Sequence, residues 1–257
     1  MNCDRLITLI HEHGLSEHQD EILASARPAI FMRLEEAEPG KVGQSRIGGE
    51  PDLPASIPWL KEDSLEMYFR FLMQINLAEL PDFPENPFPR QGMIYLFVDD
   101  YDDGADQLVV YTGTEPLQPT PLPSDREFCN DWCVDLVPHR LTFQLSPDIP
   151  RWWSQEYDAL CEKLTAAGLS DDLSIDELAR KLSNHAIGRL LGYVAGIGYD
   201  PRESKAQPQD WVNLLQVDSS TAVNLCIGDA GYLQVLIHRE DLQRLDFSRI
   251  LVNHESS

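Results

Sequence analysis

The chain has few basic residues for its length. Its 257 residues include 20 lysines and arginines against 43 aspartates and glutamates, which gives a formal net charge of −23 at pH 7. A surface with that charge repels phosphate backbones and anionic lipids, so we expect no nucleic-acid or membrane partner. The charge would complement a basic protein partner, and it would equally serve solubility alone.

The chain also lacks a long apolar segment. A membrane-spanning helix needs about 20 apolar residues, whereas runs such as 109–111 and 189–193 are far shorter. The N-terminal stretch MNCDRLITLIHEHG has neither the basic start nor the small-residue cleavage site of a signal peptide. We therefore expect a cytoplasmic protein.

Metal-binding cysteine pairs and the common catalytic motifs are missing as well. The five cysteines are odd in number and irregularly spaced, which fits reduced thiols, and Cys129 and Cys133 do not form a C-x-x-C pair. The sequence has no P-loop, no G-x-G-x-x-G turn, no G-x-S-x-G nucleophile motif and no H-E-x-x-H metal motif. We expect no metal and no other cofactor.

The apolar pattern predicts both helices and strands. Leu6, Leu9 and Ile10 recur at helical spacing, and further helical patterns lie within residues 152–184 and at 240–244. Strands are predicted by β-prone runs at 29–34, 67–77, 92–98, 108–113, 134–145, 211–219, 222–228, 231–239 and 249–253. The acidic loop DDYDDGADQ at 99–107 misses the ligand spacing of an EF-hand, so only a weak exposed cation site stays open there.

Two β-rich stretches of the chain resemble each other. The matching segments are RIGG (46–49) with RLLG (189–192), FLMQIN (71–76) with NLLQVD (213–218), and GMIYLFV (92–98) with GYLQVLI (231–237). Their common order predicts an internal duplication. We therefore predict an α+β fold of mostly antiparallel sheets in a single domain, 1–257. Its parts are N-terminal helices, one repeat over about 30–112, a helical insert over about 152–184 and a second repeat over about 186–253.

Polar residues inside these repeats are the candidate ligand-binding residues. Gln74 and Gln216 lie in apolar strands, where a buried amide needs hydrogen-bond partners, and Arg46 and Arg189 occupy matching positions. In one interpretation the glutamines face each other across a cleft between the repeats, and the arginines bind an anion there. In the other, the glutamines bond to neighbouring loops and the arginines pair with carboxylates such as Asp218.

The segment SRIGGEPDLPASIPW, residues 45–59, also has two interpretations. Its glycines allow a sharp turn or a close backbone approach, and its prolines keep the following chain extended. The segment is then a structural corner that ends with Trp59 packed on the core. Alternatively, it is a loop that helps to hold a ligand.

Several motifs together resemble one bacterial family. RIGGEPDLP…PW, FLMQINLAELP, GMIYLFVDD, LLGY, WVNLLQVDS, GDAGYLQVLI and EDLQRLDFSRI follow one another in the order and character of the YwqG-like family, whose domain has no assigned function. The resemblance covers roughly residues 30–253. It implies a compact α+β protein of mostly antiparallel strands, and it implies no established activity.

Three functions remain open from the sequence. The first, which we expect, is a non-catalytic module that binds a basic protein through an acidic surface, for example as an immunity-type protein. The second is a protein that binds a small molecule or an anion between the repeats. The third is a hydrolase-type enzyme whose site is assembled from distant residues, with His185 and Asp229 as the side chains to examine. The oligomeric state does not follow from the sequence.

Overall fold

The computed structural model describes residues 1–35, 40–62, 67–98, 107–123, 136–170, 173–183 and 185–256. Within them the α-helices are α1 (Asp4–Glu12), α2 (Gln19–Ser25), α3 (Gln155–Ala166), α4 (Leu173–Leu182) and α5 (Arg239–Arg244). The strands are β1 (Arg27–Glu35), β2 (Arg46–Ile47), β3 (Asp52–Pro54), β4 (Lys61–Glu62), β5 (Met67–Tyr68), β6 (Arg70–Asn76), β7 (Met93–Val98), β8 (Gln107–Tyr111), β9 (Leu117–Pro119), β10 (His139–Asp148), β11 (Ala186–Leu191), β12 (Trp211–Asp218), β13 (Tyr232–His238) and β14 (Ile250–Glu255).

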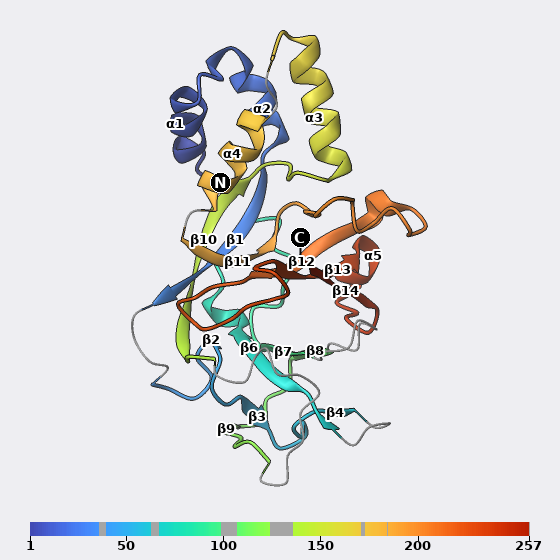
Figure 1. The fold of residues 1–257 in the computed structure, drawn as a ribbon. Coiled ribbons are helices and arrows are strands. Elements are labelled where there is room, and N and C mark those ends of the chain that lie inside the picture. Colours follow the sequence, from blue (N-terminus) through green and yellow to red (C-terminus); the bar gives the residue numbers. More distant parts are fainter. Residues whose placement is uncertain are drawn as a thin grey trace.

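One large antiparallel sheet dominates the molecule (Figure 1). Its strand order is β14-β13-β12-β11-β1-β10-β2-β6-β7-β8, and β3-β9 and β4-β5 form two small additional sheets. All of the strand pairs are antiparallel. The predicted α+β class with mostly antiparallel strands is confirmed.

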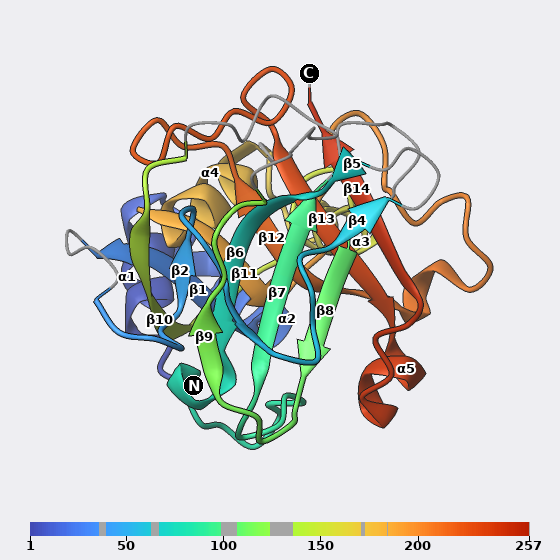
Figure 2. The ribbon, with the colours of Figure 1, turned by 90° about the horizontal axis from the view of Figure 1, so that it is seen from below.

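The large sheet curls, so that its two arms lie on either side of a shared core. Figure 2 shows β6, β7 and β8 in front of β12, β13 and β14. The largest apolar cluster contains Ile75 and Ile94 from one arm together with Leu215, Val217 and Val235 from the other. Because successive strand residues point to opposite faces, the side chains beside these core residues point to the outside of the curl.

The two arms pair their strands in the same register. In the first arm, Arg46 of β2 lies opposite Gln74 of β6, and Gln74 lies opposite Tyr95 of β7. In the second arm, Arg189 of β11 lies opposite Gln216 of β12, and Gln216 lies opposite Gln234 of β13. The residues that match in sequence therefore occupy matching positions in the sheet.

The four helices α1 to α4 form a separate layer at one end of the sheet (Figure 1). Their apolar faces bury one another, with Leu6, Leu9 and Ile10 of α1 in the same cluster as Leu164 of α3 and Leu178 of α4. The predicted N-terminal helices and the helices within 152–184 are confirmed. They cover the region where β1, β10 and β11 meet (Figure 1).

One predicted strand, 222–228, is wrong. The chain there forms a tight turn in which Ser220 and Leu225 exchange two backbone hydrogen bonds of 2.8 and 3.0 Å. Asn224 has a left-handed backbone with φ of 57°. Val223, Leu225 and Ile227 are still buried. Their alternation produced the strand-like pattern, but each side chain reaches the core from a turn.

Candidate functional site

The segment 45–59 forms a corner around a buried carboxylate. Gly48 and Gly49 have φ of 71° and 73°, a left-handed conformation that glycine adopts without strain, and the chain turns there from β2 toward β3. A Cβ at Gly48 would lie 3.1 Å from Leu136 Cβ, so the backbone approach is also close. Trp59 packs edge-on against Phe97 and donates a 2.9 Å hydrogen bond from Nε1, as predicted for the end of a corner.

Asp52, at the start of β3, organises this corner. Its Oδ1 lies 2.8 Å from Arg46 Nη2. Its Oδ2 accepts hydrogen bonds from the Gly43 amide at 2.7 Å and from Gln74 Nε2 at 2.9 Å. Gln74 Oε1 in turn accepts from the Asp52 amide at 2.8 Å. Gln74 therefore binds a neighbouring loop, and Arg46 pairs with a carboxylate, as the structural interpretation predicted.

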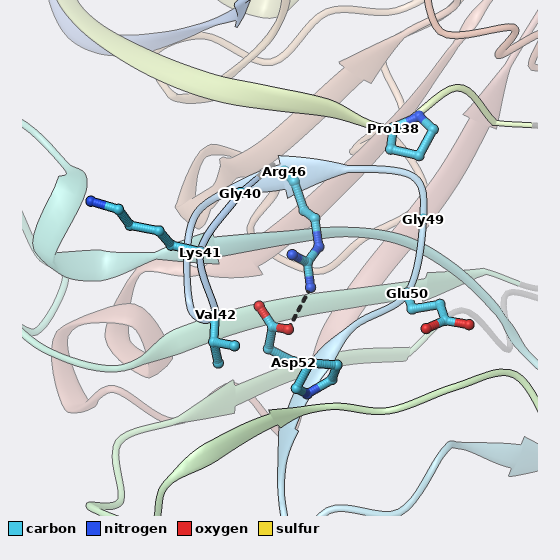
Figure 3. Close-up of a pocket in the computed structure, with 9 residues that line it drawn as sticks. Gly40, Lys41, Val42, Arg46, Gly49, Glu50, Asp52 and Pro138 are labelled. Atoms are coloured by element: carbon cyan, nitrogen blue, oxygen red, sulfur yellow. Dashed lines mark ion pairs between the residues drawn. The ribbon is translucent and has the colours of Figure 1, made fainter. Parts of the chain in front are cut away.

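A pocket of about 380 Å³ opens beside this corner. Figure 3 shows the Arg46 guanidinium pointing toward Asp52, while the Lys41 side chain points away from that pair. The pocket is lined by Gly40, Lys41, Val42, Arg46, Gly49, Glu50, Asp52, Pro119 and Pro138. Two basic and two acidic side chains are present, so their formal charges cancel. We call this the Arg46 pocket.

A larger pocket of about 650 Å³ lies beside the matching residues of the second arm. It is lined by Arg151, Trp152, Asp176, Arg180, Ser183, Arg189, Ala195, Gly196, Gln216, Asp218 and Tyr232. These residues come from β11, β12, β13, α4 and the residue after it, the loop after β11 and the segment before α3. Three of the 20 basic residues of the chain meet here. We call this the arginine pocket.

Two guanidinium groups share one carboxylate at the inner wall of the arginine pocket. Asp148, at the end of β10, is fully buried and accepts hydrogen bonds from Nε and Nη2 of Arg151, the former at 2.9 Å. Its Oδ2 accepts from the Tyr193 amide at 2.9 Å and lies 3.4 Å from Arg189 Nε. Two cations therefore share one buried counterion at this wall, and the Asp218 carboxyl also interacts with both of them.

Arg189 is not fully paired. Its Nη2 donates to the Tyr193 carbonyl at 2.7 Å, but its buried Nε makes no hydrogen bond with the described residues. Burial, followed by repulsion from Arg151, lowers the pKa of Arg189 to about 10. The buried hydroxyl of Tyr232, on the same pocket, is also without a hydrogen-bond partner among the described residues. The pocket thus contains donors that no side chain satisfies.

Asp218 of β12 also lines the arginine pocket. Its Oδ1 accepts a 2.6 Å hydrogen bond from Gln216 Nε2. Burial raises the pKa of the Asp218 carboxyl, and the hydrogen bond from Gln216 and the charges of Arg189 and Arg151 act in the opposite direction. Burial also raises the pKa of the Tyr232 hydroxyl. The arginine pocket therefore offers both hydrogen-bond donors and a carboxylate.

The structure does not bring the four predicted residues into one cleft. Arg46 lines one pocket, with Gln74 in contact with it at 3.5 Å, and Arg189 and Gln216 line the other. Four strands separate β6 from β12 in the sheet. Both glutamines neighbour core-facing residues in their strands, so they point out of the curl instead of toward each other. The predicted cleft between the repeats is wrong in this respect, because the apolar core occupies that space.

The most important partners of these arginines were missed in the sequence. Asp148, Arg151 and Tyr232 belong to no motif, and they reach the pocket only through the pairing of distant strands and the turn before α3. Asp52 lies within the quoted segment 45–59, and its position between prolines gave no sign of its burial. The sequence predicted pairing of the arginines with carboxylates, with Asp218 as one example, and Asp148 is the carboxylate that pairs with Arg151 and Arg189.

The other candidate residues form no site in the described part of the chain. His185 and Asp229 are both exposed, and Asp229 lies in a turn. No three His, Cys, Asp or Glu side chains cluster as metal ligands within the described ranges. Cys129, Cys133 and the carboxylates of the predicted weak cation site at 99–106 lie outside these ranges.

Comparison with known proteins identifies the family. The sequence model of DUF1963, a domain of unknown function, matches residues 45–255. The chain belongs to the DUF1963 family. The DUF1963 region contains both pockets except for Gly40, Lys41 and Val42. No curated protein matches the chain. No helix in the described ranges is long and apolar enough to cross a membrane.

Proposed function

We propose that this DUF1963 protein binds a small anionic ligand in its arginine pocket. The observation that carries the proposal is the pair of buried guanidinium groups of Arg151 and Arg189, which line the pocket and share the single carboxylate of Asp148. The buried Tyr232 hydroxyl on the same pocket makes no hydrogen bond with the described residues. A buried donor without a partner costs free energy, and an anionic oxygen would supply the missing acceptor. The volume of about 650 Å³ is within the usual range of small-molecule sites.

The charges around the pocket favour an anion once Asp218 is protonated. The formal charges of the three pocket arginines are matched by Asp148, Asp176 and Asp218 when all three carboxyls are ionised, and Arg151 and Arg189 share Asp148. Arg180 at the rim is already paired with Asp176, with Nε 2.9 Å from Oδ2. Asp218 opposes an anion while it is ionised, and its raised pKa reduces that opposition when the pH falls.

The Arg46 pocket supports ligand binding less well. Arg46 has a carboxylate of its own, Asp52, at 2.8 Å, whereas Arg151 and Arg189 share one. The charges are balanced in both pockets when all of the carboxyls are ionised, and Arg46, like Arg189, has a buried Nε that makes no hydrogen bond with the described residues. Arg46 and Gln74 make the contacts of a structural corner. Their anion-binding role stays a prediction. The role we propose therefore concerns Arg189 and Gln216 of the original four residues.

Isothermal titration calorimetry with inorganic phosphate tests the proposal. The variants are Arg180→Gln, at the rim of the arginine pocket, and Arg244→Gln, on α5. Arg244 does not line the pocket. Both arginines are nearly equally exposed, at 69% and 68%, and both pair with an acidic residue four positions earlier, so they form a matched set. We expect Arg180→Gln to weaken phosphate binding about threefold, a typical size for an exposed charge, and Arg244→Gln to leave it unchanged.

Arg189→Lys is the stronger test. Lysine keeps the charge but loses the planar set of donors, and we expect phosphate affinity to fall at least tenfold. A thermal melt shows whether the variant folds. Equal affinity in Arg180→Gln, Arg244→Gln and the wild type, together with unchanged binding in folded Arg189→Lys, would refute the proposal. Absence of phosphate and carboxylate binding to the wild type would refute it as well.

The other sequence-based expectations stay proposals or predictions. We propose that the two arms arose by duplication, supported by the shared register of Arg46, Gln74 and Tyr95 with Arg189, Gln216 and Gln234. We also propose that the family resemblance extends to the YwqG-like group, on the motifs quoted above. The single domain, the basic protein partner, the immunity-type role and the cytoplasmic location stay predictions.

A further inference from the structure

Two exposed tryptophans stand at the mouth of the arginine pocket. Trp152 and Trp153 are 45% and 43% exposed, whereas Trp59 is only 7% exposed. Their rings are stacked, with centroids 5.7 Å apart and planes 20° from parallel. Trp152 lines the pocket directly. Large aromatic side chains exposed together beside a pocket are a feature of binding surfaces.

The backbone holds this pair in a defined position. Arg151, directly before it, is fixed by its bonds to Asp148, and Ser154, directly after it, caps α3 by accepting from the Tyr157 amide at 3.2 Å. Trp153 itself has a left-handed φ of 58°, which is strained for a residue other than glycine. The Gly196 amide donates a 3.3 Å hydrogen bond to the Trp152 carbonyl, which ties this segment to the loop after β11.

We propose that Trp152 stacks on an aromatic ring of the ligand whose anionic group is held by Arg151 and Arg189. This inference rests on the proposed function. The ligand class is a ring-bearing phosphate of the size of a nucleoside monophosphate. Arginine matches the geometry of phosphate oxygens, and an indole face stacks on any heterocyclic base.

Arg151 and Trp152 are consecutive in the chain, which supports a single ligand that contacts both the guanidinium group and the indole ring. Arg151 reaches inward to Asp148, and Trp152, its neighbour, stays at the mouth of the same pocket. The net charge of −23 opposes a nucleic-acid polymer, which carries many phosphates, but it opposes a mononucleotide much less. A partner protein on the tryptophans alone would leave the buried Tyr232 hydroxyl of the pocket without a hydrogen-bond partner among the described residues.

Calorimetry with three probes tests the ring contact: AMP, ribose 5-phosphate and inorganic phosphate. We expect AMP to bind about tenfold more tightly than ribose 5-phosphate. Trp152→Ala should remove that difference and leave the affinity for ribose 5-phosphate unchanged. The control is Tyr199→Ala, an exposed aromatic residue (52%) that does not line the pocket, and it should keep the tenfold preference.

The outcomes separate this inference from the proposed function. If phosphate binds and AMP binds no more tightly than ribose 5-phosphate, the ring contact is refuted and the anion site stands. If Tyr199→Ala loses the preference as fully as Trp152→Ala, the ring contact at Trp152 is refuted. If no probe binds the folded wild type, both proposals fail.

Discussion

Asp148→Asn is expected to cause a large loss of stability. Asparagine keeps the shape of the side chain but removes the charge that Arg151 and Arg189 share. Removing one partner of a buried ion pair typically costs about 3–5 kcal/mol, because the remaining charge is left uncompensated. Here two guanidinium groups lose their counterion. The corresponding fall in Tm is about 6–20 °C for a chain of this length.

Asp82→Asn is the matched control. Asp82 also pairs with an arginine, Arg90, but the two side chains are 70% and 66% exposed. Exposed ion pairs contribute about 0–1 kcal/mol, so we expect little change in Tm. Thermal denaturation of both variants at pH 7 measures the difference. Similar falls in Tm for the two variants would contradict a central role for Asp148.

Asp218→Asn is expected to stabilise the protein at neutral pH. Burial raises the pKa of the Asp218 carboxyl in the folded state, so the folded state binds this proton more tightly than the unfolded state does. The destabilisation by the ionised group is absent at low pH, grows as the pH rises above about 4 and is complete above the raised pKa. Asparagine keeps the acceptor for Gln216 Nε2 and removes the charge.

The measurement is Tm of the wild type and Asp218→Asn as a function of pH. Each kcal/mol gained would raise Tm by about 2–4 °C, and the gain should disappear as the pH falls toward 4. Asp246→Asn is the control, and its change in Tm at pH 7 should have the opposite sign. Hydrogen bonds from Ser248 lower the pKa of that exposed carboxyl. A lower Tm for Asp218→Asn at pH 7 would show that this carboxylate stabilises the arginines instead.

Asp218→Asn should also tighten phosphate binding at pH 7. The ionised carboxylate repels an anion in the same pocket, and its protonation at lower pH relieves that repulsion. Sulfate is the probe for the pH series, because phosphate itself loses charge as the pH falls through neutrality. The wild type should gain sulfate affinity as the pH falls, whereas the variant should show a flatter dependence.

The sequence predicted the elements of this fold better than their contacts. Leu6, Leu9 and Ile10 gave the correct buried face of α1 because helical spacing is local. The error at 222–228 arose because Val223, Leu225 and Ile227 alternate as in a strand while the backbone turns. The local apolar pattern of a sequence indicates which side chains are buried. It does not indicate whether another strand is present to pair with the backbone.

The candidate site was predicted in part for the same reason. Matching of the two repeats identified Arg189 and Gln216, which the structure places opposite each other. Asp148 and Tyr232 come from β10 and β13 and are brought in by strand pairing over long sequence distances. The expected cleft failed because a polar residue in an apolar strand can face either side of a sheet, and neighbouring residues decide which side is core.

The central position of β1 has a consequence for how the protein can be divided. The DUF1963 match begins at residue 45, yet β1 (Arg27–Glu35) lies between β10 and β11 and hydrogen-bonds to both. A fragment cut at the family boundary would lose the strand that joins the two arms. Asp148 and Arg189 would then sit on strands without a common neighbour. The region that matches the family model is thus smaller than the region that assembles the arginine pocket.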